Sequence, residues 1–334
     1  MKLIQKIFLY SFLFLLGVAF FWWLYRDLDW TKLKQGLLIT NYYWIIVSIL
    51  LGLLSHYVRA IRWKMLIRPM GYNPKVNNIF LSVLVMYFTN LIIPRAGEVA
   101  RCTILSRYEK IPASKLIGTM IVERIADMVT MFILIIIVFI INVGVVKEFF
   151  IQNPGISANF IKLLSFRNII VGIIAFILII VLLFVIKPFK NTKIGDKIKK
   201  LEHGFKEGIK TILVLNNRLY FIGCTLFIFS CWLFMLFAVF KAYPPTSHLS
   251  IEAGMFTFLM GGLAMLAPVQ AGIGAWHYMV IKSVLLYGIP EENGKIFALV
   301  AHSSTSLIYL FFGFIALALF PIMNKNYKGS ANGD

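Results

Sequence analysis

Three charged residues interrupt an apolar segment near the middle of the chain. Glu123, Arg124 and Asp127 lie within the stretch 116–141, which is otherwise mainly apolar. On a helix, residues three and four positions apart share a face, so these side chains would form one polar patch. Charged side chains within a membrane-spanning helix face the bundle interior or a cavity, and they mark a pathway. Two interpretations remain open: a polar site in a transport cavity, and a structural ion-pair network.

Two other segments place proline, glycine and polar residues inside apolar sequence. The residues that interrupt the first segment are Asn90, Pro94 and Gly97, and those that interrupt the second are Pro268, Gly272 and Gly274. Lipid cannot hydrogen-bond a freed N–H or C=O group, so a helix broken at membrane depth must lie against protein or a water-filled cavity. A pair of interrupted apolar segments in matching positions is typical of a transporter site between two repeats.

Charged residues at the first interruption are suited to bind an anion. Arg95 and Arg101 lie near the predicted start of a new half-helix, where free backbone N–H groups and guanidinium groups together make a phosphate receptor. Glu98 has two interpretations, because it could order these arginines or cap the half-helix through the helix dipole. Asn90, one turn before Pro94, is expected to satisfy the carbonyl groups that the proline leaves free.

Histidines accompany the second interruption. His277 lies in the opening turn of the half-helix after Gly274, and His302 precedes a run of serine and threonine in the final apolar helix. Either imidazole can change its protonation near neutral pH, so proton coupling or contact with a headgroup is favoured over metal binding. The three cysteines form no C-x-x-C pair, and we expect neither a metal nor another cofactor.

The composition is that of a polytopic α-helical membrane protein. Of the 334 residues 60% are hydrophobic and the mean hydropathy is +0.84, whereas soluble domains are about 45–50% apolar. A net charge of +19 would suggest a nucleic-acid partner for a soluble protein, but here the excess lies in short loops. A basic surface that gathers anionic lipid headgroups is compatible with this distribution. The first apolar run, 7–25, lacks a small-residue cleavage site and predicts an uncleaved helix.

The apolar segments differ in length. Those long enough to cross a bilayer are 7–25, 42–58, 116–141, 168–186, 219–240 and 296–320. Two others, 79–93 and 252–267, stop at the interruptions after roughly 22–24 Å of helix, short of the roughly 30 Å hydrocarbon core. Each is followed by a second short segment, 96–107 or 274–288. We therefore predict an all-α membrane protein with about six full transmembrane helices and two re-entrant helical hairpins.

The order of these segments predicts a single integral membrane domain, 1–334, that contains an inverted repeat. The first repeat covers 42–141 and the second covers 219–320. A connector, 142–218, carries a basic cytoplasmic segment that is expected to lie on the inner leaflet. The tail, 321–334, is expected to be disordered. With the N-terminus inside, the first repeat enters the membrane from the inside and the second from the outside.

The distribution of basic residues predicts the orientation. The segments assigned to the inside hold 23 lysines and arginines, and those assigned to the outside hold 8. Because cytoplasmic loops are enriched in basic residues, both termini are expected to be cytoplasmic, in the cell (inner) membrane. The basic helix end from Tyr57 to Arg68 contains Trp63 and is expected to be an interfacial anchor.

Four motifs carry a family resemblance. They are Arg62-Trp63-Lys64-x-Leu66, Asn90-x3-Pro94-x2-Gly97-Glu98-x2-Arg101, Val122-Glu123-Arg124-x2-Asp127 and Pro268-x3-Gly272-Ile-Gly274. Together they resemble the flippase-like membrane region of lysylphosphatidylglycerol synthase proteins, over about residues 5–322. The resemblance implies a bilayer-embedded domain with re-entrant helices that is associated with moving lipids between leaflets. The cytosolic aminoacyl-transferase domain of the full synthases is missing, so tRNA-dependent lipid lysylation is not expected.

Two functions from different classes are compatible with these features. The first is a lipid flippase or transporter for an anionic or polyprenyl-phosphate-linked lipid, with Arg95, Arg101 and Arg124 on the phosphate. The second is a non-catalytic membrane module that presents lipid to a separate glycosyl- or aminoacyl-transferase. The family's second motif continues to a glutamate, whereas Trp276-His277 stands here, which leaves the headgroup open. No nucleotide-binding loop or nucleophile elbow is present, so no enzymatic activity is expected.

Overall fold

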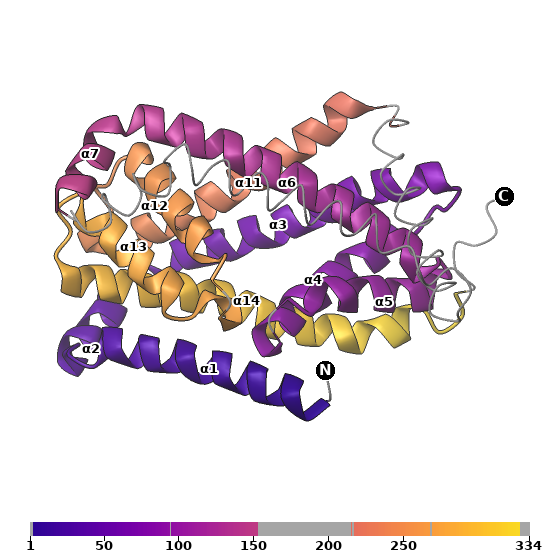
Figure 1. The fold of residues 1–334 in the computed structure, drawn as a ribbon, viewed down its shortest axis with the longest axis horizontal. Coiled ribbons are helices and arrows are strands. Elements are labelled where there is room, and N and C mark those ends of the chain that lie inside the picture. The colour runs from indigo at the N-terminus through magenta and orange to yellow at the C-terminus, as the bar shows by residue number, and fades with distance from the viewer. Residues whose placement is uncertain (1–2, 94, 153–214, 216, 268, 328–334) are drawn as a thin grey trace, which may run out of the picture.

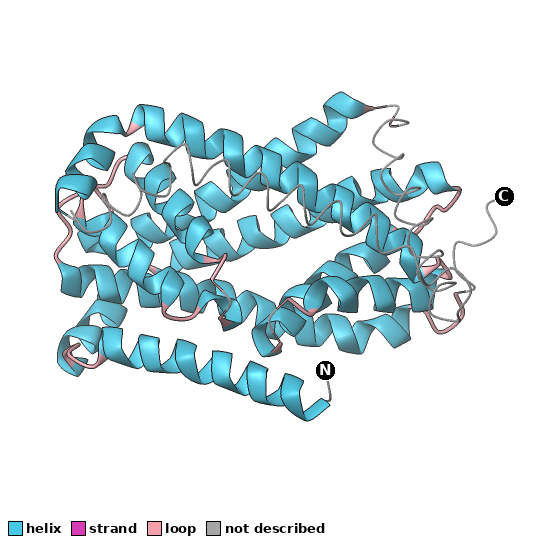
Figure 2. Ribbon diagram, in the orientation of Figure 1, coloured by secondary structure: helices cyan, strands magenta, loops and turns pink. Residues whose placement is uncertain are grey.

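The structure is a computed structural model that describes residues 3–93, 95–152, 215, 217–267 and 269–327. Within these ranges every regular element is a helix (Figure 2). The helices long and apolar enough to cross a membrane are Tyr42–Met70, Ala113–Ile141, Arg218–Ala242 and Glu291–Met323. The prediction of a polytopic α-helical membrane protein is therefore confirmed. Pro94, Pro268, the predicted span 168–186 and most of the basic connector lie outside the described residues.

The helices fall into two series of four, preceded by an N-terminal pair. The N-terminal pair is α1 (Leu3–Tyr25) and α2 (Trp30–Ile39). The first series is α3 (Tyr42–Ile67), α4 (Val76–Ile92), α5 (Gly97–Glu109) and α6 (Ala113–Ile141), which the short α7 (Val143–Gln152) follows. The second series is α11 (Arg218–Ala242), α12 (Ile251–Ala264), α13 (Ala275–Leu285) and α14 (Glu291–Met323). Each series begins and ends with a long helix and has two short helices between them.

The two short helices of each series pack against each other as a hairpin. Helix α4 has 17 residues and α12 has 14, so each extends only about 26 or 21 Å. Each is shorter than a hydrocarbon core of about 30 Å. Figure 1 shows α4 and α5 in the right half of the view, and α12 and α13 in the left half. The hairpins thus approach the middle of the molecule from opposite ends.

The contacts between the two series match a two-fold arrangement. The opening helices α3 and α11 pack along each other, and the closing helix of each series lies on the hairpin of the other, α14 on α4 and α6 on α12. Other neighbours within the two series also occur in equivalent pairs, such as α5 with α6 and α13 with α14. Separate apolar cores form within each half, one around Trp63 and Leu66 and one around Phe240 and Phe297. These pairs support the predicted repeat.

An asparagine ends the closing helix of each series. Asn142 caps α6 and donates to the carbonyl of Val138, and Asn324 caps α14 and donates to the carbonyl of Phe320. Both side chains are buried. Because a helix end leaves carbonyl groups without partners, an amide in this position satisfies one of them while its other atoms remain free to bond elsewhere.

Each asparagine also binds the hairpin of the other repeat. Tyr287, just after α13, donates to Asn142 at 2.8 Å, and Asn324 exchanges amide hydrogen bonds of 2.8 and 2.9 Å with Asn78 near the start of α4. At the second of these ends Tyr327 donates to Glu109 at 2.8 Å. Burial and the Glu109 carboxylate raise the pKa of the Tyr327 phenol, so this donor stays protonated at pH values where an exposed tyrosine ionises.

The structure agrees with the sequence at one helix end and differs from it in other segments. The apolar segment 42–58 and the basic helix end that follows it form one helix, α3, which ends at Ile67. The segments 26–41 and 142–167, which were counted as lying outside the membrane, contain the short helices α2 and α7. The tail predicted to be disordered from 321 is ordered to Tyr327, because Asn324 and Tyr327 hold it against the first hairpin. Residues 328–334 lie outside the described residues.

Candidate functional site

Glu123 is the centre of a buried cluster of arginines. From the middle of α6, its carboxylate lies 3.3 Å from Arg59, 3.0 Å from Arg62 and 3.0 Å from Arg101. None of these four side chains is exposed to any degree. Arg59 and Arg62 come from α3 and Arg101 comes from α5, so three helices of the first repeat meet at one carboxylate.

Asp127 extends the cluster by one helical turn. Its carboxylate lies 2.7 Å from Arg62 and 3.3 Å from Arg59, and its side chain is 12% exposed. Since Glu123 and Asp127 are four residues apart on α6, their carboxylates lie on the same face of the helix. Arg59 and Arg62 each bridge both carboxylates, and so bind α3 to α6 along one full turn.

Arg124 lies at the open edge of this cluster and is its most loosely held cation. Its guanidinium is 3.9 Å from Glu123 and 3.8 Å from Asp127, near the limit for an ion pair. Its side chain is 35% exposed, whereas those of the other three arginines are fully buried. Arg124 can therefore leave these carboxylates for an external anion at less cost than its neighbours.

Aromatic rings and hydroxyl groups hold the three buried arginines in place. Arg101 lies over the ring of Trp63 at 4.3 Å and Arg59 over the ring of Trp232 at 5.1 Å. Such contacts with an aromatic face stabilise a cation without neutralising it. Arg62 donates a hydrogen bond of 2.9 Å to Thr225, which anchors it to α11 of the second repeat.

The cluster carries more positive than negative charge. Four arginines share two carboxylates, which leaves an excess of two positive charges. Within the described part of the chain, the nearby Glu98 makes no ion pair with these arginines. Because Coulomb energies rise as the surrounding dielectric constant falls, an uncompensated charge at this depth attracts an anion strongly.

Local sequence explains how the arginines reach Glu123. Arg59 and Arg62 are three residues apart on α3, on the side that also buries Trp63 and Leu66. Helix α5 approaches α4 closely at Gly97, where an added Cβ would meet the carbonyl oxygen of Met86. Glycine is required at this crossing, and it sets the position from which Arg101 reaches α6.

The tips of the two hairpins meet. Arg95, at the tip of the first hairpin, has a positive φ of 61° and donates a hydrogen bond of 3.1 Å to the carbonyl of Leu266 at the second. Gly97 at the start of α5 donates its N–H to Asn90 at 2.8 Å. Asn90 therefore has a structural role, as expected, but it acts on a free N–H group rather than on a carbonyl.

The second tip is built from unusual backbone and aromatic side chains. Gly272 and Gly274 have φ of 72° and 81°, and Ala271 between the helices has φ of 49°. His302 lies 2.9 Å from the carbonyl of Ala271, and its ring centroid is 4.5 Å from that of His277. The rings of Phe21, Tyr25 and Trp276 surround the two histidines.

The structure sorts the predicted residues into separate groups. Glu123, Arg124, Asp127 and Arg101 come together, whereas His277 and His302 pair with each other at the second tip. Across the described residues no hydrogen bond, ion pair or ring contact links either histidine to an arginine of the cluster, and Arg95 lies exposed at the first tip. Whether any of these residues binds a headgroup stays a prediction.

Arg59 and Arg62 were not predicted as site residues, although Arg62 belongs to one of the family motifs. The basic helix end was interpreted as an interfacial anchor, and that interpretation is wrong because Arg59, Arg62 and Trp63 are fully buried. The available signal was the spacing of the two arginines, which places both on the apolar face of α3. Fully buried arginines require paired charges, so the carboxylates of α6 were their natural partners.

The described residues contain no candidate metal site. No group of three or more histidine, cysteine, aspartate or glutamate side chains has the arrangement of such a site in the part of the chain that the structure describes.

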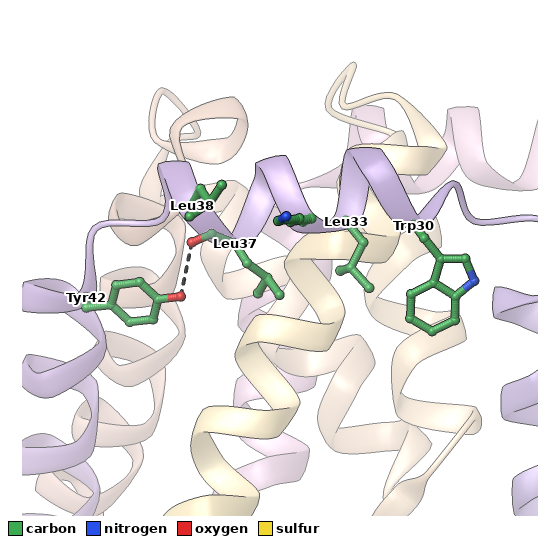
Figure 3. A pocket seen from close by; sticks show the side chains of 6 residues that line it. Trp30, Leu33, Leu37, Leu38 and Tyr42 are labelled. Atoms are coloured by element: carbon green, nitrogen blue, oxygen red, sulfur yellow. Dashed lines mark hydrogen bonds between the residues drawn. The ribbon is translucent and has the colours of Figure 1, made fainter.

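An open groove runs along α2 (Figure 3). It is lined by Trp30, Leu33, Lys34, Leu37, Leu38 and Tyr42. Tyr42 donates a hydrogen bond of 3.0 Å to the carbonyl of Leu37 across this groove (Figure 3).

Comparison with known proteins shows the family to which this chain belongs. Residues 8–313 match the family model described as the lysylphosphatidylglycerol synthase TM region. The chain is also 25% identical to a UPF0104 membrane protein of Methanocaldococcus jannaschii, over 96% of this chain and 95% of that relative. No solved structure matches it significantly. Because the family match extends over most of the sequence, the chain belongs to the family of the lysylphosphatidylglycerol synthase transmembrane region.

Proposed function

We propose that this protein moves a lipid with a phosphate-bearing headgroup, anionic or polyprenyl-phosphate-linked, between the leaflets of the cell membrane. The observation that carries the proposal is the buried cluster around Glu123, in which four arginines share two carboxylates. A network that served only to hold helices together would be expected to balance its charges, because an unpaired buried charge is costly. A surplus of guanidinium groups instead suits an anionic ligand.

Arg124 is the residue that would first meet the headgroup. It is the exposed member of the cluster and has the longest ion pairs, 3.8 and 3.9 Å. A lipid phosphate would compete with Glu123 and Asp127 for its guanidinium, while Arg59, Arg62 and Arg101 keep the carboxylates in place. The family match supports a lipid as the ligand, since the family model describes the membrane region of a lipid synthase.

The meeting hairpins supply a route for the headgroup. Broken helices are tolerated at membrane depth where they line a cavity or lie against protein, and discontinuous helices form transporter sites between repeats. We propose that both hairpins are re-entrant and that their tips, joined by Arg95 and Leu266, lie within the bilayer. Glu98, His277 and His302 would then line the path beyond the arginine cluster.

The orientation is part of the proposal. Arg59, Arg62 and Arg101 are buried, so they no longer count as loop charges, and 20 inner basic residues remain against 8 outer ones. This asymmetry still favours cytoplasmic termini. In a variant without the three native cysteines, which are all buried, a cysteine at His248 should be labelled from outside the cell and one at Asn73 should not. The opposite pattern would reverse the orientation.

Lipid transport in proteoliposomes tests the function. Purified protein would be reconstituted with a fluorescent phosphatidic acid, and the fraction that becomes accessible in the outer leaflet would be followed over time. We expect transport by the native protein, a loss of at least tenfold for Arg124→Ala, and no change for Arg26→Ala, which removes the same charge from an exposed turn. Binding without transport in the native protein would favour a module that presents lipid to a separate transferase.

A further inference from the structure

The charge of the arginine cluster also indicates which class of headgroup it accepts. We infer that the cluster selects a headgroup with two negative charges, a phosphomonoester or a pyrophosphate, over a phosphodiester with one charge. The inference rests on the proposed function, because it assumes that a lipid headgroup reaches the cluster. It concerns the specificity of that site and not whether transport occurs.

Charge balance is the first reason. Arg59, Arg62, Arg101 and Arg124 carry four positive charges, and the two carboxylates of α6 carry two negative ones. A phosphodiester would leave one positive charge uncompensated, whereas a phosphomonoester dianion would leave none. Because the dielectric constant at this depth is low, that remaining charge has a large effect on affinity.

The supply of hydrogen-bond donors is the second reason. Eight buried nitrogen atoms of the four guanidinium groups form no hydrogen bond with good geometry, although three of them, one each on Arg59, Arg101 and Arg124, lie within ion-pair distance of Glu123. Three belong to Arg101, two each to Arg59 and Arg124, and one to Arg62. A phosphomonoester offers three terminal oxygens as strong acceptors, one more than a phosphodiester. A donor-rich site therefore gains more from the monoester.

The packing of the buried arginines is the third reason. Arg101 and Arg59 lie on the faces of Trp63 and Trp232, and Arg62 is bonded to Thr225. These contacts fix the cations in position but contribute no negative charge. The surplus is thus a constant feature of the site, and among the described residues no further carboxylate forms an ion pair with it.

A pair of lipids that differ by one charge and one methyl group tests the inference. Native protein in phosphatidylcholine nanodiscs would be titrated with phosphatidic acid or with phosphatidylmethanol, its singly charged methyl ester, with binding measured by tryptophan fluorescence. The assay would be run at pH 8, where a phosphomonoester with a second pKa of about 6 is a dianion. We expect at least tenfold tighter binding of phosphatidic acid, and Arg124→Ala should reduce that ratio while Arg26→Ala should not.

Other outcomes separate the inference from the proposed function. Equal affinities for the two lipids would overturn the inference, and transport of phosphatidylmethanol that still depended on Arg124 would leave the proposed function intact. Glycerol 3-phosphate and inorganic phosphate distinguish a lipid ligand from a soluble one. If either competes with phosphatidic acid at a similar concentration, the cluster recognises the dianion alone, which supports the charge argument. Tighter binding of phosphatidylmethanol would contradict it.

Discussion

The two repeats are alike at their ends and unlike at their centres. Asn142 and Asn324 cap the closing helices in the same way and bind the hairpin of the other repeat. At the centres, Glu123 and Arg124 stand eleven and twelve residues after Pro112, whereas Ala301 and His302 stand at the same distances after Pro290. The arrangement of helices is thus repeated, but within the described residues only the first repeat has a central cluster of ion pairs.

This difference helps to separate the residues that hold the fold together from those that are candidates for binding a ligand. Features present in both repeats, such as the capping asparagines, are needed by any bundle built from two such units. Among the described residues of the second repeat the arginine cluster has no counterpart, and His302 instead contacts the backbone of its own hairpin tip. We therefore propose that the headgroup site lies in the first repeat and that the second tip forms part of the route.

The largest expected effect is loss of the central carboxylate. Glu123→Gln should lower the free energy of unfolding by about 3–5 kcal/mol, because three fully buried arginines lose their shared partner. Thr305, the counterpart of Asp127 in the second repeat, only bonds back to its own helix, so Thr305→Val should cost less than about 1 kcal/mol. Denaturant-induced unfolding in detergent measures the free energy of unfolding of both variants. Equal losses of stability for the two would mean that the centres of the two repeats do not differ as described.

The second largest effect is expected at Gly97, where α5 approaches α4 closely in the first hairpin. Gly97→Ala should destabilise the protein by about 1–3 kcal/mol, since the new methyl group would overlap the backbone of Met86 and the side chain of Asn90. Gly223 lies on α11 with nothing within 4 Å of an added Cβ, so Gly223→Ala should be neutral or slightly stabilising. Thermal unfolding of the two variants would check this difference, and a harmless Gly97→Ala would show that the hairpin can separate there without cost.

The two capping asparagines should differ in their contribution. Asn324→Ala should cost about 1–3 kcal/mol, because it leaves the buried Asn78 amide without its reciprocal partner. Asn142→Ala removes one hydrogen bond from Tyr287 and should cost about 1 kcal/mol. Hydrogen exchange of the start of α4 and of the end of α13 would localise each effect. An effect of Asn324→Ala confined to α14 would argue against its role in holding the first hairpin.

The smallest effect is expected at the junction of the tips. Arg95 is exposed and donates one hydrogen bond to the Leu266 carbonyl, so Arg95→Ala should change stability by no more than about 1 kcal/mol. Transport should nevertheless slow if the tips move together. A matched Lys110→Ala variant removes the same charge at the other end of α5. Equal transport rates for the two variants would mean that the contact between the tips is incidental.

The sequence predicted the helices and hairpins better than it predicted which side chains pack together between them. Apolar length and the proline and glycine interruptions indicated both hairpins, and helical spacing placed Glu123 beside Asp127. The depth of Arg59, Arg62 and Trp63 could not be predicted, because a basic, tryptophan-containing helix end is also typical of an interfacial anchor. Their burial depends on the carboxylates of α6, which lie 61 or more residues further along the chain.

We propose that Arg124 binds phosphate through the geometry of its guanidinium group and not through its charge alone. The rate of phosphatidic acid transport per folded molecule, measured for Arg124→Lys, tests this proposal most directly. An ammonium group keeps the charge but cannot form the bidentate fork, so we expect a loss of at least tenfold at normal expression and stability. Full activity of Arg124→Lys would show instead that Arg124 is only a structural charge.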